Sequence, residues 1–174
     1  MEQKEKKLWS DFYAPTSADS EQHAREAIPK SLVDPVTYLN ELYHDVAIKE
    51  YKTEARKTLL AAAGKHGRIL DLGCGSGAEL KLLASEAVQH GEFPQLIGVD
   101  PSEEFVEASK KACQEHSNVQ ILKGGGEKLS SVVSSKVDAV RIERVLQHID
   151  LEIIKKILKE VEVRLSQRKH FFFF

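Results

Sequence analysis

The 174-residue sequence has few cysteines, no long apolar run and no excess of either charge. Its two cysteines, Cys74 and Cys113, are too few for a disulfide framework, and we expect no metal site from them. No stretch is long enough to cross a bilayer, and residues 1–7 (MEQKEKK) are charged where a signal peptide would be apolar. The default expectation is therefore a cytoplasmic protein in a reducing compartment.

Basic and acidic side chains nearly balance, with 25 Lys and Arg against 27 Asp and Glu. This balance gives no reason to expect general binding to nucleic acid or to a membrane. The length suffices for one domain with a hydrophobic core, and no internal repeat is visible. We divide the chain into an N-terminal helical segment, residues 1–64, and a core, residues 65–174.

Helical patterns dominate the N-terminal segment. Apolar spacing predicts helices over residues 35–43 and 45–63, the second ended by Gly64. An aromatic patch further upstream would lie on one helical face; it comprises Leu8, Trp9, Phe12 and Tyr13. Two interpretations of this segment stay open: ordinary packing on the core, or a lid over a ligand.

A glycine-rich turn organises the core. Residues 69–72 form a short apolar strand interrupted only by Asp71, glycines follow at 73, 75 and 77, and a helical pattern runs over residues 76–90. A strand, a glycine turn and a helix in this order bind adenosine-containing ligands in doubly wound sheets. The spacing also fits a dinucleotide site, but a carboxylate at Asp71 would repel a pyrophosphate and suit a cationic amino group.

A second acidic residue follows the next predicted strand, residues 95–99. Asp100 stands about twenty residues beyond the glycines, where an acid can accept hydrogen bonds from two ribose hydroxyls. Pro101 and Ser102 then start a helix. Nicotinamide-binding folds use an acid in the same way, so a nicotinamide-dependent reductase is one alternative.

The stretches ILDLGCGSG (69–77) and GVDPS (98–102) resemble the first two motifs of the class I S-adenosylmethionine-dependent methyltransferases. The resemblance covers roughly residues 67–165. It implies a three-layer α/β/α Rossmann-like fold with a mostly parallel sheet ordered 3-2-1-4, and S-adenosylmethionine as cofactor. In that family the first motif wraps the methionine end of the cofactor and the second holds its ribose. The cofactor-binding candidates in these motifs are Asp71, Gly73, Cys74, Gly75, Ser76, Gly77, Asp100, Pro101 and Ser102.

The third predicted strand, residues 119–122, leads into KGGGEKL (123–129). Similar methyltransferases have a pattern close to G-D-A-E-x-L here, and its first acid usually bonds the adenine amino group. This sequence has Gly125 where that acid should stand. Gly126 and Glu127 are the remaining candidates for the adenine side, although Glu127 can equally be the first-turn acid of a short helix.

The fourth predicted strand, residues 137–142, is followed by ERVLQHID (143–150), which closely resembles segments of some of these enzymes. The carboxyl end of a strand lies beside the ligand crevice, so we expect Glu143 and Arg144 near the transferred methyl and Glu143 near the cofactor. His148 is a candidate general base, with a structural role as its alternative. The catalytic residue thus stays open between His148 and Glu143.

The sequence ends in four phenylalanines where related enzymes begin a fifth strand. Four residues are too few for an ordinary strand, so we expect a shortened fold with a barely paired fourth strand. Self-association through that edge and Phe171 to Phe174 is expected. The predicted function is methyl transfer from S-adenosylmethionine to a small-molecule acceptor. The alternative is a truncated, non-catalytic fragment that binds cofactor or a partner.

Overall fold

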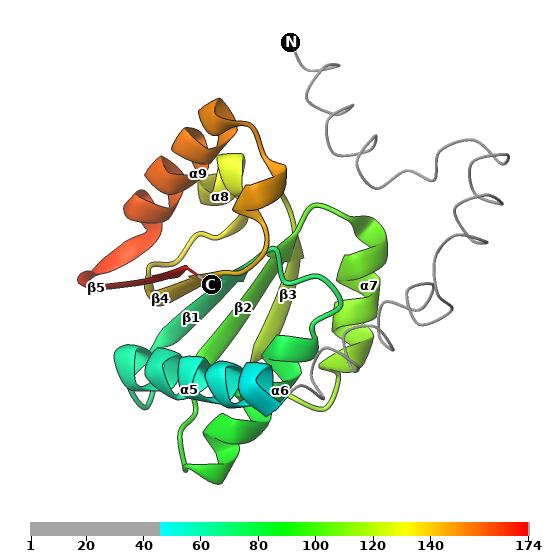
Figure 1. Cartoon of the computed structure of the whole chain (residues 1–174), viewed down its shortest axis with the longest axis vertical. Helices are drawn as coiled ribbons and strands as arrows, with labels where there is room; N and C mark the ends of the chain where they lie inside the picture. The colour runs from blue at the N-terminus through cyan, green and yellow to red at the C-terminus, as the bar shows by residue number, and fades with distance from the viewer. Residues whose placement is uncertain (1–45, 174) are drawn as a thin grey trace, which may run out of the picture. The chain divides into compact units, whose positions relative to one another are not determined.

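The computed structural model describes residues 46–173 (Figure 1). The chain divides after Glu54 into two compact units, and the residues from Ala55 onward form the unit that contains the sheet. The predicted helix over residues 35–43 and the aromatic patch lie outside the described residues. The division of the chain at residue 64, and the lid, stay predictions.

Helices and strands alternate along the described chain, as the sequence predicts. The first helix, α5, ends at Ala63, directly before Gly64, whose φ of 73° suits only glycine without strain. The strands are β1 (Arg68–Leu72), β2 (Gln95–Asp100), β3 (Val119–Lys123), β4 (Val137–Ile142) and β5 (Leu165–Phe173). The helices are α5 (Val46–Ala63), α6 (Ala78–Gln89), α7 (Glu103–Ala112), α8 (Leu129–Val132) and α9 (Leu151–Arg164), with 3-10 turns η1 (Gly126–Lys128) and η2 (Leu146–His148).

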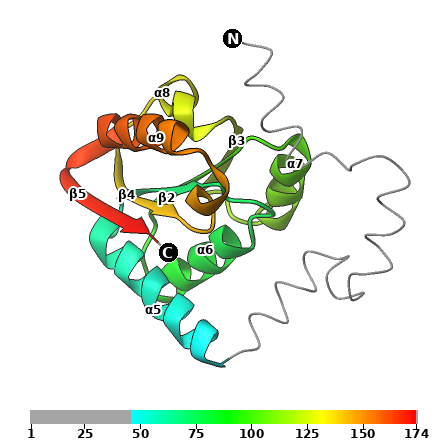
Figure 2. The same cartoon turned by 45° about the horizontal axis from the view of Figure 1, so that its top comes forward.

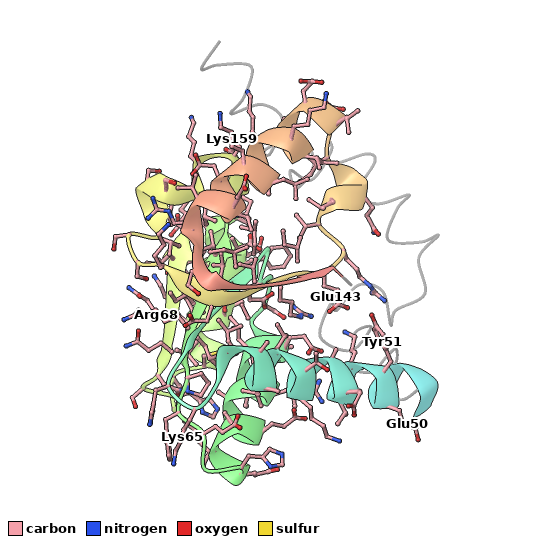
Figure 3. All side chains as sticks on the ribbon, turned by 90° about the vertical axis from the view of Figure 1, so that its left-hand side faces the viewer. Glu50, Tyr51, Lys65, Arg68, Glu143 and Lys159 are labelled. Atoms are coloured by element: carbon pink, nitrogen blue, oxygen red, sulfur yellow. The ribbon has the colours of Figure 1, made fainter. Side chains whose placement is uncertain are left out.

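The strands form one five-stranded sheet in the order β3-β2-β1-β4-β5, and every neighbouring pair is parallel. This confirms the predicted Rossmann-like α/β fold and its 3-2-1-4 order. Because all strands run the same way, their carboxyl ends share one edge of the sheet. Arg68, which begins β1, and Glu143, which follows β4, lie at opposite ends of the sheet (Figure 3).

Helices cover both faces of the sheet (Figure 2). Successive strand residues point to opposite faces, so Leu70 and Leu72 pack under α8 and α9, while Ile69 packs under α6 and residues 55–63 of α5. Asp71 therefore belongs to the α5 and α6 face. The larger buried cluster, on the α9 face, includes Ile97, Val99, Leu129, Val140, Ile142, Ile157 and Val161.

The prediction that the chain ends in too few residues for a fifth strand is wrong. β5 begins at Leu165, directly after α9, and pairs with β4 in parallel with Val140 opposite Phe171. The polar residues that follow Leu165 join this strand because ladder hydrogen bonds use backbone groups, whatever the side chain. β4 is thus an interior strand, and β5 forms the edge of the described sheet. None of the helices in residues 46–173 is both long and apolar enough to span a bilayer.

Candidate functional site

The glycine turn after β1 is held tightly against β2. The backbone N–H groups of Gly73 and Cys74 both donate to the carbonyl oxygen of Val99, at 2.8 and 3.2 Å. Gly77 has a φ of 78°, and a Cβ built there would lie 3.0 Å from Cα of Ser109 on α7. Only glycine avoids both the strain and the collision at this position. The close approach fixes α6 and α7 side by side at the end of the turn.

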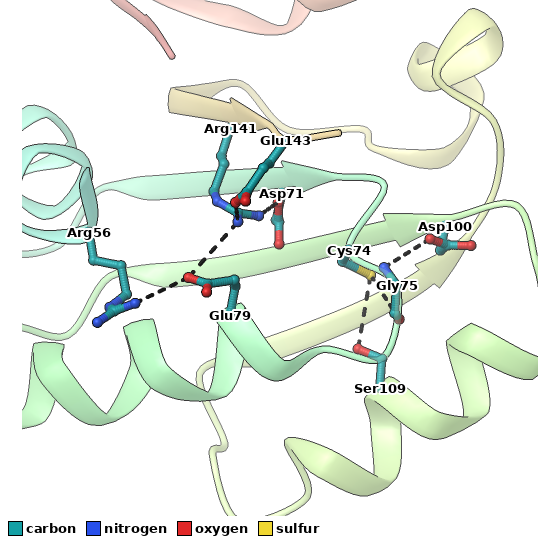
Figure 4. Close-up of polar contacts among 9 residues, drawn as sticks. All are labelled: Arg56, Asp71, Cys74, Gly75, Glu79, Asp100, Ser109, Arg141 and Glu143. Carbon is teal, nitrogen blue, oxygen red and sulfur yellow. Dashed lines mark hydrogen bonds and ion pairs between the residues drawn. The ribbon is translucent and has the colours of Figure 1, made fainter. Parts of the chain in front are cut away.

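The tip of the turn is different, because it is open. Gly75 has a φ of 53°, and a Cβ built there would meet nothing within 4 Å. Its backbone N–H donates to Oδ2 of Asp100 at 2.9 Å (Figure 4). Space beside a turn of exposed backbone is what a ligand needs in order to lie against it.

Asp100 ties the turn to the start of the next helix. Its Oδ1 accepts from the backbone N–H of Ser102 at 2.9 Å, and the Ser102 hydroxyl in turn accepts from the N–H of Phe105 at 3.3 Å. The side chain is only 5% exposed, and this burial raises its pKa although the two N–H groups oppose the change. A carboxylate has about four lone-pair directions, so each oxygen retains room for a further donor.

Cys74 and Ser76 complete the turn in different ways. Cys74 is buried, and its Sγ lies 3.9 Å from Oγ of Ser109, behind the turn. Burial, helped by the nearby charges of Asp71 and Asp100, raises the pKa of the Cys74 thiol. Only backbone atoms of Cys74 can therefore face a ligand at the tip, whereas Ser76 is partly exposed.

A buried group of charges surrounds Asp71 (Figure 4). Asp71 lies opposite Arg141 in the β1–β4 register, and its Oδ1 pairs with the guanidinium of Arg141 at 2.7 Å. The same guanidinium pairs with Glu143 and lies 3.9 Å from Oε2 of Glu79, in the first turn of α6. Asp71 is 2% exposed and Arg141 8%.

The group extends to α5 through Arg56. One guanidinium nitrogen of Arg56 pairs with Glu79 at 3.3 Å and the other with Glu86 at 2.8 Å. We refer to these six residues, Arg56, Asp71, Glu79, Glu86, Arg141 and Glu143, as the ionic cluster. It places four carboxylates against two guanidinium groups, which leaves an excess of negative charge.

The excess of negative charge shifts the pKa values of the central pair, Asp71 and Arg141. Burial raises the pKa of Asp71, and the neighbouring Glu79 and Glu143 raise it further against the opposing effect of Arg141. Burial alone would lower the pKa of Arg141, but its three carboxylate neighbours outweigh this and raise it. Asp71 is therefore no isolated carboxylate at the mouth of a strand, and any preference for a cation must come from the whole ionic cluster.

The loop after β3 contacts Asp100, and the turn after β4 contacts the glycine turn. The N–H of Gly124, after β3, donates to the carbonyl oxygen of Asp100 at 3.0 Å. Gly126 is buried, and a Cβ there would come within 2.9 Å of Leu72. After β4, Arg144 is exposed with a φ of 55°, and Val145 fills the space that a side chain at position 73 would need.

Three predicted site residues remain: His148, Pro101 and Ser102. His148 ends η2, and its side chain lies outside what the structure describes. Pro101 and Ser102 are partly exposed beside Asp100. Within residues 46–173, no three His, Cys, Asp or Glu side chains are grouped to hold a metal ion.

A family profile described as "Methyltransferase domain" matches residues 69–167, more than half of the chain. This chain belongs to the class I S-adenosylmethionine-dependent methyltransferases. The nicotinamide-dependent alternative is therefore set aside. The match begins inside β1 and ends inside β5, so it spans the glycine turn, Asp100 and the turn after β4.

Individual relatives are longer proteins. The chain is 34% identical over 116 residues to an uncharacterised 37.1 kDa protein in transposon TN4556 of Streptomyces fradiae, covering 67% of this chain and 32% of that protein. It is 29% identical over 175 residues to peramine synthetase ppzA of Metarhizium rileyi, covering 95% of this chain but 6% of the synthetase. The chain thus spans about a third or less of these curated relatives.

Solved methyltransferases share the fold. The N-methyltransferase NodS from Bradyrhizobium japonicum, in complex with S-adenosyl-L-homocysteine, matches with a TM-score of 0.62 at 17% identity, over 75% of this chain and 63% of that one. PKMT2 from Rickettsia typhi, in complex with AdoHcy, matches with a TM-score of 0.56 at 23% identity, over 70% of this chain and 24% of that one.

The methyltransferase motifs did not predict the ionic cluster. Four of its members were missed: Arg56, Glu79, Glu86 and Arg141. One signal was present, because Arg141 is a charged residue in the fully buried part of β4. A charge in a strand that is buried on both faces needs a partner. Asp71, a buried charge opposite Arg141 in the neighbouring strand β1, is that partner.

Proposed function

We propose that this domain binds S-adenosylmethionine at the carboxyl ends of β1 and β2 and transfers its methyl group to a small-molecule acceptor. The observation that carries the proposal is the joint placement of Asp100 and the open tip at Gly75. A buried carboxylate with spare acceptor capacity adjoins a turn with room above its backbone. A ribose diol supplies the two donors that this carboxylate can still accept.

The methionine end of the cofactor fits the ionic cluster. That end carries an ammonium, a sulfonium and one carboxylate, so its net charge is positive, and the cluster offers four carboxylates against two guanidinium groups. An excess of buried negative charge favours a cation and disfavours a phosphate, because Coulomb interactions are strong where water is excluded. Glu143, at 12% side-chain exposure, is the cluster carboxylate that directly follows β4.

When bound, the cofactor supplies an electrophilic methyl group with a neutral thioether as its leaving group. The task of the chain is then to align an acceptor with that methyl, and alignment alone can supply a large part of the rate. The carboxylate of Glu143 is held in place by its ion pair with the guanidinium of Arg141. We therefore assign Glu143 a binding role and leave His148 as the candidate for proton removal.

The cofactor site is tested by calorimetric titration with S-adenosylhomocysteine, the product that keeps the ribose and adenine. We expect binding by the unaltered chain and its loss in Asp100→Ala. The matched control is Glu104→Ala, which removes an exposed carboxylate from the first turn of α7 and leaves Asp100 intact. Absence of heat at high ligand concentration with the folded, unaltered chain would favour the non-catalytic alternative.

The small-molecule acceptor is a separate part of the proposal. It is supported by the resemblance of ERVLQHI (143–149) to small-molecule enzymes and by the balanced charge of the chain, which gives no reason to expect general binding to nucleic acid. The test is transfer of radiolabelled methyl groups in a cell extract separated afterwards by ultrafiltration. Label in the filtrate supports the proposal, and label retained with protein or RNA contradicts it.

A further inference from the structure

Arg56 is the member of the ionic cluster that α5 contributes. It precedes residues 69–167, the part of the chain that the methyltransferase profile matches. Its side chain is nevertheless buried, at 7% exposure. Burial alone would lower the pKa of Arg56, but Glu86 and Glu79 outweigh this effect and raise it, so the guanidinium keeps its charge. A buried charge at this place raises the question of what it does for the site.

The guanidinium of Arg56 contacts α6 at two points. Its Nη1 lies 3.3 Å from Oε2 of Glu79, in the first turn of α6, and its Nη2 lies 2.8 Å from Oε1 of Glu86 on the same helix. The two carboxylates are about two helical turns apart, so they lie on one face of α6. A planar guanidinium can hold two carboxylates at once, because its donors form a rigid fork. Arg56 thereby sets where the Glu79 carboxylate lies.

The same oxygen of Glu79 also faces Arg141 (Figure 4). Oε2 of Glu79 lies 3.3 Å from Nη1 of Arg56 but 3.9 Å from Nη2 of Arg141, so Glu79 is held nearer to Arg56. Nη2 of Arg141 is also the nitrogen that pairs with Oε2 of Glu143. Glu79 and Glu143 thus approach one nitrogen of Arg141 from two elements, and Glu143 is the closer of the two.

We propose that Arg56 is a positioning residue of the cofactor site and acts on Glu143 through Glu79. By holding Glu79, it leaves Nη2 of Arg141 available to Glu143. Without Arg56, Arg141 is the remaining guanidinium of the ionic cluster, and Glu79 would move toward it and compete with Glu143. The inference rests on the proposed S-adenosylmethionine site, in which Glu143 contributes to binding of the methionine end.

The test compares two ligands that share an adenosine part. S-adenosylhomocysteine carries the amino-acid end of the cofactor and methylthioadenosine lacks it, so the ratio of their affinities measures what that end contributes. We expect the unaltered chain to bind S-adenosylhomocysteine more tightly in titration calorimetry. Arg56→Met should reduce this ratio by about tenfold or more, the range for one hydrogen bond to a charged group, and leave the affinity for methylthioadenosine unchanged.

A second substitution separates positioning from direct contact with the ligand. Glu79→Gln removes the charge that would compete for Arg141, so Arg56→Met/Glu79→Gln should have a higher ratio than Arg56→Met alone. A residue that touched the ligand itself, or one that only held α5 in place, would not be rescued in this way. The matched control is Lys57→Met, which removes one positive charge from an exposed position of the same helix and should keep the ratio of the unaltered chain.

Far-UV circular dichroism checks that each variant is folded. If Arg56→Met does not fold, Arg56→Lys takes its place, because lysine keeps the charge but offers one nitrogen where arginine offers two. We expect Arg56→Lys to lower the ratio by a smaller factor, and added Glu79→Gln to raise it again. In that case, an unchanged ratio in Arg56→Lys, or a loss that Glu79→Gln does not reverse, overturns the role of Arg56.

The two proposals fail in different ways. If S-adenosylhomocysteine binds more tightly than methylthioadenosine but Arg56→Met leaves the ratio unchanged, the role of Arg56 is overturned and the cofactor site stands. A double variant with a ratio no higher than that of Arg56→Met has the same meaning. If both ligands bind the unaltered chain equally well, the placement of the methionine end fails, and the role of Arg56 with it. If neither ligand binds, the cofactor site itself is refuted.

Discussion

Removing Arg141 should destabilise the domain far more than removing the carboxylate with which it pairs. Arg141 lies within ion-pair distance of three carboxylates: Asp71, Glu79 and Glu143. Arg141→Met keeps an unbranched side chain but leaves Asp71, only 2% exposed, without its partner at 2.7 Å. Loss of one member of a buried pair costs about 3–5 kcal/mol. That is a large share of the roughly 5–15 kcal/mol that stabilises an ordinary domain.

Asp71→Asn is the milder change. It leaves Arg141 paired with Glu79 and Glu143, and it reduces the excess of carboxylates in the ionic cluster. We expect a loss of at most about 1.5–3 kcal/mol, the range for one hydrogen bond to a charged group, because the asparagine oxygen can still accept from Arg141. The double variant Arg141→Met/Asp71→Asn should be more stable than Arg141→Met alone, because it no longer leaves a buried carboxylate unpaired.

The measurement is urea unfolding followed by far-UV circular dichroism, with Arg68→Met as the matched control. Arg68 is an exposed arginine at the start of β1, and its replacement should change the unfolding free energy by less than about 0.5 kcal/mol. The pH dependence gives a second readout. Without Arg141, the pKa of Asp71 rises above its already raised value in the folded state.

A group whose pKa is raised on folding contributes stability at low pH that is lost as the pH rises through the folded-state pKa. The deficit of Arg141→Met relative to the unaltered chain should therefore be largest at neutral pH and shrink toward acid. The reasoning is refuted if Asp71→Asn costs as much as Arg141→Met, or if the deficit grows as the pH falls.

Three further predictions concern the glycine turn and its neighbours. Because the pKa of Asp100 is raised, its carboxylate takes up a proton above the usual pH range for aspartate. The affinity for S-adenosylhomocysteine, measured by titration calorimetry, should therefore fall as the pH is lowered. Asp100→Asn should remove this pH dependence. Gly77→Ala should lower the free energy of urea unfolding by about 2–4 kcal/mol, because it combines a φ of 78° with a collision at Ser109. Its control, Gly91→Ala, has a φ of 66° in open space and should lower that free energy by about 1–2 kcal/mol. The Cys74 thiol, buried and with a raised pKa, should react with a thiol reagent at pH 8 only after denaturant is added; rapid reaction of the native chain at Cys74 would contradict its placement behind the turn.

Much of the fold follows from local sequence patterns. The predicted strand over residues 137–142 and the predicted helix that begins at Leu151 match β4 and α9, since each has the apolar period of its type and a clear boundary. The glycine turn and the position of Asp100 beside it were also predicted, because each depends on a few residues at short spacing, and their part in cofactor binding stays a prediction. Ser102 caps α7 as its position before the helical pattern indicates.

Two features could not be predicted in the same way. The ion pair between Arg141 and Asp71 joins residues 70 apart, and only the parallel register of β1 and β4 brings them together. β5 was underestimated because the residues after Leu165 are polar, and neither strand period nor β-propensity marks them. Both features depend on which strands become neighbours, and a single sequence does not state this.

In the proposed cofactor site, two backbone amides beside Asp100 would report the binding of a ligand. The amide protons of Gly75 and Ser102 both point at the carboxylate oxygens that would receive the ribose, each across 2.9 Å. Any molecule that draws electron density from that carboxylate must weaken or reorient these two bonds. In a nuclear magnetic resonance titration, the two amide resonances should therefore shift together and saturate at one ligand concentration, before any chemistry takes place.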